Sequence, residues 1–96
     1  MSENEPRQWT FMSTHFLVLL CIAEDPGIRM ADVAERVGLT ERAVQRIVTD
    51  LVGGGYLHRS RVGRRNQYEI NREMPLRHLE TQHRRLGELL SLIAQP

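Results

Sequence analysis

The sequence predicts a mainly helical domain with one small β-hairpin, an α+β fold. Two amphipathic helical patterns joined by a short turn containing glycine occupy the middle of the chain. Two short segments of strand character, joined by a basic turn that contains glycine, follow them. A length of 96 residues limits the chain to one domain. A core of this size is marginal and gains stability from oligomerisation.

Charge is distributed unevenly along the chain. The formal net charge is only +1, so the chain as a whole is not a basic polymer-binding protein. Between Arg42 and Arg72, however, seven arginines face two acids, Asp50 and Glu69, which predicts a local positive surface. Every basic residue is arginine. That usage fits the codon bias of a GC-rich genome, and it also fits bidentate contacts to phosphate and guanine.

The N-terminal residues 1–12 are predicted to form a flexible tail, because residues 1–8 are polar. Trp9, Phe11 and Met12 then either begin the core or form a subunit contact. No signal peptide is recognisable, and the longest apolar run, residues 16–23, is too short to span a bilayer. We therefore expect a cytoplasmic protein with no membrane partner.

A first helix is predicted over residues 13–24, and its centre is apolar nearly all round. One side would face the domain core and the other a subunit interface. The single cysteine, Cys21, lies in this run, so we expect a buried side chain and no intramolecular disulfide. Asp25-Pro26-Gly27 ends the helix. Ile28 and Arg29 would form a short strand beside the hairpin.

The next two helices form a helix-turn-helix arrangement. The first of them follows the apolar residues Ala31, Val33, Ala34 and Val37. Thr40 is a good N-cap for the second, which should end at Gly53-Gly54-Gly55. Apolar residues at helical spacing define its inner face: Val44, Ile47, Val48, Leu51 and Val52. The opposite face carries polar side chains that suit DNA: Arg42, Gln45, Arg46 and Thr49, with Thr40 at the start.

A hairpin is predicted from strands over residues 56–62 and 66–70, with Gly63-Arg64-Arg65 as a three-residue turn. Its tip and flanks carry arginines and no acid: Arg59, Arg61, Arg64 and Arg65. Such side chains suit phosphates or the narrow minor groove.

Residues 13–72 resemble the winged helix-turn-helix regulators of bacteria, MarR-like or ArsR-like in style. The resemblance is carried by LLCIAEDPGIRM, ADVAERVGLTERAVQRIVTDL and GYLHRSRVGRRNQYEI. It implies that the helix after Thr40 enters the major groove of double-stranded DNA and that the hairpin, the wing, touches the minor groove or the backbone. It also implies a dimer. The triple glycine departs from the family pattern, in which a more helical segment with one glycine is usual.

A last helix is predicted over residues 75–94, beginning at Pro75, a good first helical residue. Its apolar positions step by three and four residues in the manner of a coiled-coil seam, with His83 as the polar member. We expect this seam, together with Phe11, to form a homodimer interface: Leu76, Leu79, His83, Leu86, Leu90 and Ile93. The alternative is that the seam folds back on its own domain.

Three other functions fit the sequence less well than DNA binding. A zinc site, as in some ArsR-like repressors, would have to use His78, Glu80 and His83, but a spacing of five residues separates the imidazoles on a helix. We therefore predict no metal and no cofactor, while a small-molecule effector between subunits stays open. A protein-interaction module would carry apolar anchors on the face that here shows arginine and glutamine. No catalytic motif is present, so the sequence predicts no enzyme.

Together these patterns predict a sequence-specific transcriptional regulator. As a homodimer it would read an inverted-repeat operator with one recognition helix in each half-site. Repression is the commonest outcome that the resemblance implies.

Overall fold

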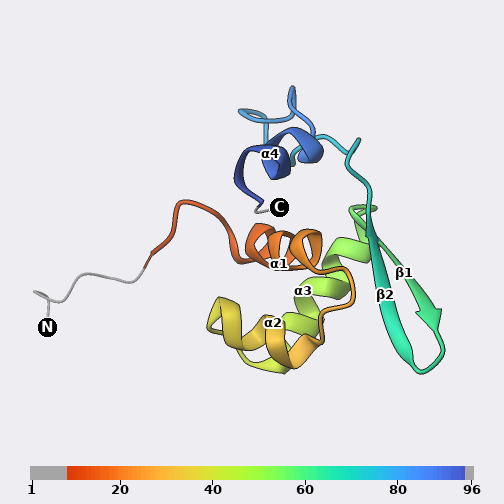
Figure 1. Cartoon of the computed structure of the whole chain (residues 1–96). Coiled ribbons are helices and arrows are strands. Elements are labelled where there is room, and N and C mark those ends of the chain that lie inside the picture. Colours follow the sequence, from red (N-terminus) through yellow and green to blue (C-terminus); the bar gives the residue numbers. More distant parts are fainter. Residues whose placement is uncertain (1–8, 95–96) are drawn as a thin grey trace, which may run out of the picture.

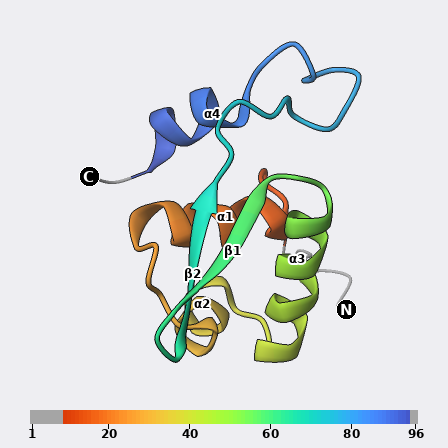
Figure 2. The same ribbon diagram turned by 90° about the vertical axis from the view of Figure 1, so that its right-hand side faces the viewer.

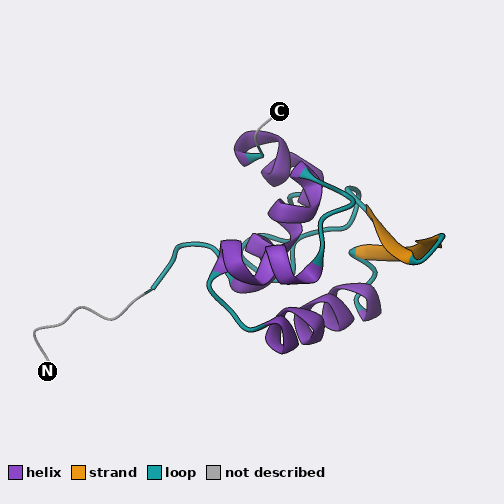
Figure 3. Cartoon of the chain, turned by 60° about the horizontal axis from the view of Figure 1, so that its bottom comes forward, coloured by secondary structure: helices purple, strands orange, loops and turns teal. Residues whose placement is uncertain are grey.

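The computed structural model describes residues 9–94 and contains four helices and one hairpin within that range. Figure 1 shows the order of the elements, and Figure 3 shows the hairpin projecting from one side of the helices. The bounds are α1 (Thr14–Glu24), α2 (Met30–Val37), α3 (Glu41–Gly53), β1 (Leu57–Val62), β2 (Arg65–Ile70) and α4 (Leu86–Ile93). The predicted α+β fold is confirmed.

The first three helices form where the sequence predicts them; Thr40 is the predicted N-cap of α3, and Ser13 caps α1 and does not begin it. The Ser13 hydroxyl accepts the Phe16 backbone N–H, and the Thr40 hydroxyl accepts the Ala43 N–H at 3.1 Å. Each cap satisfies a backbone donor that the helix itself leaves free. The helices pack around one core that α1 supplies most heavily, since five of its residues are buried. Cys21 is among them, and burial raises the pKa of its thiol.

The hairpin pairs in a register that corrects the predicted turn. Val62 pairs with Arg65, so the turn has two residues, Gly63 and Arg64, and not three. Gly63 has a φ of 65°, a conformation that glycine adopts without the steric cost of a side chain. The strands therefore begin at Leu57 and Arg65, each displaced by one residue from the prediction.

The predicted strand at Ile28 and Arg29 does not form, and the sheet has two strands within residues 9–94. Ile28 is instead a buried core residue in the turn between α1 and α2. Burial in the core accounts for the apolar character of Ile28 without any strand pairing. Two residues would also form too few backbone hydrogen bonds with the hairpin to specify a strand.

The predicted helix over residues 75–94 is wrong in its first half, because α4 covers only Leu86–Ile93. Before α4, Pro75 and Arg85 form an isolated antiparallel bridge, and the Leu76 N–H donates to the Arg84 carbonyl at 2.9 Å. Residues 77–84 thus form a closed loop. Its last residues lead into a helix start where Glu88 accepts the Arg85 N–H at 2.8 Å, a bond that lowers the pKa of Glu88.

The coiled-coil seam is lost with that helix. Leu86 and Leu90 are 2% and 0% exposed and belong to the core of their own chain, whereas Leu79 on the loop is 80% exposed. His83 is also exposed and lies outside any helix. Because α4 packs against α1, both leucines are removed from water within the monomer. In a long helix that extends away from the domain, they would be buried only by a partner subunit. The alternative of a seam folded onto its own domain therefore holds for Leu86 and Leu90.

A close backbone approach holds α4 against the end of the hairpin. The Gly87 N–H donates to the Arg72 carbonyl at 2.9 Å, and a Cβ at position 87 would lie 2.8 Å from Arg72 Cβ. We expect Gly87→Ala to destabilise the fold by about 1–3 kcal/mol, the usual cost of overpacking. Thermal unfolding measures this loss. Gly53→Ala is the control, since a Cβ there meets no atom within 4 Å; equal stability of the two variants would contradict the assignment.

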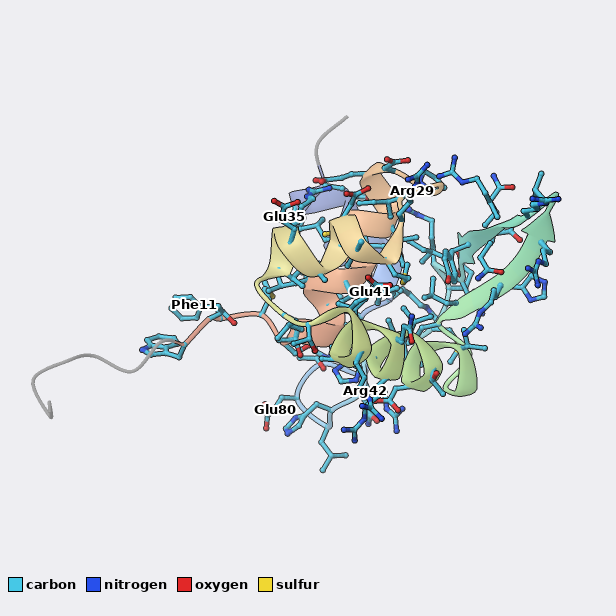
Figure 4. The ribbon with its side chains drawn as sticks, turned by 90° about the horizontal axis from the view of Figure 1, so that it is seen from below. Phe11, Arg29, Glu35, Glu41, Arg42 and Glu80 are labelled. Atoms are coloured by element: carbon cyan, nitrogen blue, oxygen red, sulfur yellow. The ribbon has the colours of Figure 1, made fainter. Side chains whose placement is uncertain are left out.

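Residues 9–12 precede α1 as a short non-helical arm. Trp9 and Phe11 are 69% and 90% exposed, and their rings meet edge-to-face at 5.0 Å. Figure 4 shows Phe11 well away from the helices. The rest of the predicted tail, residues 1–8, lies outside the described residues. No helix in residues 9–94 combines the length and the apolar character that crossing a membrane requires.

Candidate nucleic-acid interface

One polar face of α3 stays exposed while the opposite face packs into the core. Val44, Val48 and Leu51 are buried on the inner side. The predicted contact residues on the outer side are all exposed: Arg42, Gln45, Arg46 and Thr49. Arg42 extends into solvent from the first turn of α3 (Figure 4). The helix thus presents two guanidinium groups and an amide near its positive N-terminal end.

Not every polar group on this face is available to a ligand. The Thr49 hydroxyl donates to the Gln45 backbone carbonyl at 3.0 Å, whereas the Thr40 hydroxyl accepts the Ala43 N–H and keeps its own hydrogen to donate. Asp50 of α3 pairs with His15 of α1 at 2.9 Å. The donors that remain on this face are therefore the side chains of Arg42, Gln45 and Arg46, with the Thr40 hydroxyl at its start.

The hairpin lies beside α3, and Figure 2 shows the two elements next to each other with α4 beyond their upper ends. Residues paired across the strands share a face, so the pair Arg59 and Tyr68 lies on the same side as the buried Leu57. This inner face is turned toward the helices. Arg61 follows on the same face, nearer the tip, and Arg64 lies in the turn itself.

The four wing arginines have different surroundings. The Arg59 guanidinium carbon lies 6.0 Å from the centre of the Tyr68 ring, a cation–π distance. Arg65 donates to the Gly27 carbonyl in the turn between α1 and α2, at 2.5 Å. The side chains of Arg61 and Arg64 make no hydrogen bond or ion pair within the described part of the chain. The sequence predicts the same role for all four arginines. In the structure, Arg59 and Arg65 are held by contacts within the chain, whereas the side chains of Arg61 and Arg64 are not.

Arg65 connects the wing to the body of the domain in the place where a third strand was predicted. We expect Arg65→Ala to speed amide hydrogen exchange near the hairpin turn, because the variant loses this hydrogen bond. The free energy of unfolding should fall by no more than about 1.5 kcal/mol. Exchange measured by NMR without DNA tests this, with Arg64→Ala as the control of equal charge. Equal protection in both variants would show that the bond does not hold the wing.

The residues considered for a metal site do not come together. His78 Nδ1 accepts the Glu80 backbone N–H at 3.0 Å, an interaction local to the loop. Among residues 9–94, no three His, Cys, Asp or Glu side chains are grouped closely enough to hold a metal ion.

Helix α2, the turn to Thr40, the exposed face of α3 and the adjacent hairpin define a winged helix-turn-helix domain. Consistent with this class, residues 13–57 match the family model described as winged helix-turn-helix DNA-binding. The chain is also similar to YhjH of Bacillus subtilis (strain 168), an uncharacterized HTH-type transcriptional regulator, with 37% identity over 49 residues. That alignment covers 51% of this chain and 28% of the relative's own length.

These matches confirm the resemblance to bacterial winged helix-turn-helix regulators, a DNA-binding class. The choice between MarR-like and ArsR-like stays a prediction. Sequence reasoning missed the group that holds Arg65, the Gly27 carbonyl. A backbone carbonyl has no sequence signature.

Proposed function

We propose that this chain is a sequence-specific transcriptional regulator that binds operator DNA as a homodimer and represses transcription. The observation that carries the proposal is the exposed face of α3, where two arginines and a glutamine extend from the N-terminal half of the helix. In this motif that half meets base edges in the major groove, where arginine suits guanine and glutamine suits adenine. A protein-interaction module would expose apolar anchors there instead.

The wing supports the same proposal from the other side of the interface. Arg61 and Arg64 are exposed and unpaired within residues 9–94, so they would meet phosphates or the minor groove. Arg59, held over the Tyr68 ring, would contact the DNA backbone with them. Arg65 would add to the positive potential near DNA while it holds the wing.

A homodimer would use apolar side chains that the monomer leaves uncovered. Phe11 of the predicted interface is exposed, as is Leu79; Trp9 and Leu92 are exposed as well. Leu76 and Ile93 are half-buried and would form the edge of such a surface. A twofold dimer then places two recognition helices one turn of DNA apart, about 34 Å, which matches an inverted repeat.

Binding of a small-molecule effector is a second candidate function, and one observation favours it. An open groove of about 950 Å³ lies between the start of α1, the end of α3 and the segment before the loop. Its floor is apolar, with Phe16, Leu19 and Tyr56, and Arg77 adds a cation to the lining. A small molecule bound there would touch α3 directly.

The test of the proposed function is selection of bound duplexes from a random pool, followed by titration of the selected duplex against salt. We expect an inverted repeat and an affinity that falls steeply as salt rises, because arginines displace counterions from phosphates. Recovery of unrelated sequences with no common motif would exclude sequence-specific binding under those conditions. Analytical ultracentrifugation of the free protein tests the dimer separately.

Arg64 at the wing tip should contact phosphate and not base. We therefore expect Arg64→Ala to weaken binding to the selected duplex and to random duplexes by a similar factor. The slope of log K against log salt should decrease by about one, the change expected for one lost phosphate contact. Fluorescence anisotropy at several salt concentrations measures both quantities. A loss confined to the selected duplex would instead assign Arg64 to base recognition.

A further inference from the structure

Two aromatic side chains stay in water next to the start of α1. Trp9 and Phe11 are 69% and 90% exposed. The other aromatic side chains of the chain are buried: Phe16, Tyr56 and Tyr68. The rings of Trp9 and Phe11 meet edge-to-face at 5.0 Å, so they form one apolar unit. An exposed unit of this kind indicates a surface that another molecule covers.

Met12 holds the base of the arm (residues 9–12) against the domain. Its side chain is half-buried and packs on the core, whereas Phe11, one residue earlier, lies well away from the helices (Figure 4). The Thr10 hydroxyl donates to the Met12 carbonyl at 2.5 Å, a bond local to the arm. The aromatic pair is therefore directed away from its own core and toward a second molecule.

A groove that suits such a pair begins at the base of the arm. It is the groove of about 950 Å³ described above, and Ser13, the residue directly after the arm, is part of its lining. Its floor continues the core with Phe16, Leu19 and Leu76, and polar side chains complete the lining, among them Asp50 and Arg77. An apolar centre with a polar rim is typical of protein–protein interfaces.

We propose that the arm of one copy of this chain docks in the groove of a second copy, and that the second copy returns the same contact. The inference rests on the homodimer of the proposed function and names the surface that forms it. Four residues span at most about 14 Å, so the two grooves would face each other across the twofold axis. An effector in the groove would compete with the arm and would thereby weaken the dimer.

The area of the exchange matches that of a stable dimer. Each aromatic side chain buries roughly 150–250 Å² when it is covered. A reciprocal exchange covers four rings, so the rings alone lose about 600–1,000 Å² and the two grooves lose a comparable area. The total of about 1,200–2,000 Å² is the usual size of a specific interface. Because the same segment is exchanged in both directions, one favourable contact is made twice.

The test uses two variants of the full chain, each of which lacks one half of the contact. In the arm variant, Trp9→Ala and Phe11→Ala remove both exposed rings and leave the core intact. In the groove variant, Gly53→Gln adds a polar side chain to the groove lining, at a position where a Cβ meets no atom within 4 Å. Circular dichroism and thermal unfolding establish that both variants are folded.

Analytical ultracentrifugation measures the dissociation constant of the dimer. We expect the arm variant to raise this constant at least roughly 100-fold, because four buried rings are lost. The groove variant should raise it roughly tenfold, because the added amide would be buried without a partner. Gly53→Ala, which leaves the groove open, and Val62→Ala, which removes an exposed apolar side chain of the hairpin, are the controls. Each should change the constant by less than about threefold.

Mixing the two variants tests whether the arm crosses between copies. A mixed dimer keeps one intact arm opposite one intact groove, whereas neither variant alone keeps such a pair. Trp9 is the single tryptophan of the chain, so the arm variant contributes no tryptophan fluorescence. We expect the Trp9 emission of the groove variant to shift to shorter wavelength, and to saturate, as the arm variant is added. An emission that stays unchanged would overturn the exchange.

The remaining outcomes separate the arm from the proposed homodimer. An arm variant that dimerises as tightly as the wild type would leave the homodimer standing and overturn the docking of the arm. A Trp9 emission that is at short wavelength in the wild type at every protein concentration, and that does not respond to mixing, would assign the arm to its own groove and also overturn the exchange. A wild type that remains monomeric would overturn both dimer proposals, while the selection of bound duplexes still tests DNA recognition.

Discussion

Simultaneous replacement of Arg42 and Arg46 by alanine should lower the affinity for a selected operator by at least about 30-fold. Each arginine that contacts a guanine edge contributes about 1–3 kcal/mol of discrimination, and 1.4 kcal/mol is a factor of ten. Both side chains are exposed on α3, so their truncation leaves the buried face of the helix intact. Fluorescence anisotropy with selected and scrambled duplexes measures the loss and shows how much of it is specific.

A variant of equal charge separates base recognition from general attraction to DNA. Arg84→Ala combined with Arg85→Ala removes two positive charges from the segment directly before α4, at residues that belong neither to α3 nor to the hairpin. We expect this variant to lose affinity by a small factor that is the same for both duplexes. Equal affinity of the wild type and the Arg42/Arg46 variant for the operator would exclude α3 as the recognition helix.

The single variant Arg46→Ala refines the same prediction. If Arg46 reads a base, the preference at one operator position should relax by about 1–3 kcal/mol while other positions keep theirs. A uniform loss would assign Arg46 to a phosphate.

Leu90→Ala should destabilise the monomer by about 2–5 kcal/mol, the usual cost of a cavity left by a buried leucine. Leu90 is 0% exposed and packs in the core with α1, so its loss should lower the melting temperature by roughly 10 °C or more. Differential scanning calorimetry at two protein concentrations measures the change and its dependence on association.

Leu92 in the same helix supplies a matched control, because it is 83% exposed. Leu92→Ala removes the same atoms and should change monomer stability by less than about 0.5 kcal/mol. If Leu92 belongs to a dimer surface, its replacement should weaken association instead. Equal destabilisation by the two variants would contradict the packing of α4 onto the core.

The sequence alone was sufficient for the elements whose signals are local. Ser13 and Thr40 are capping residues directly before apolar repeats, so the starts of α1 and α3 were predictable. Apolar spacing also determined which face of α3 is buried, and hence that Arg42 and Arg46 are exposed. For the same reason the chain could be assigned to the winged helix-turn-helix class before its structure was known.

Tertiary contacts decided the features that depend on residues far apart in sequence. The spacing of apolar residues from Leu76 to Ile93 fits a long helix. In the structure, the backbone N–H groups of Leu86 and Gly87 donate instead to carbonyls near the end of the hairpin, and the chain bends there. The bend allows Leu86 and Leu90 to be buried within the monomer. Arg59 and Arg65 are alike as residues of a basic hairpin. Only folding places one over the Tyr68 ring and the other against the Gly27 carbonyl. The spacing of apolar residues predicts which side chains are buried. Which surface buries them depends on how the whole chain packs.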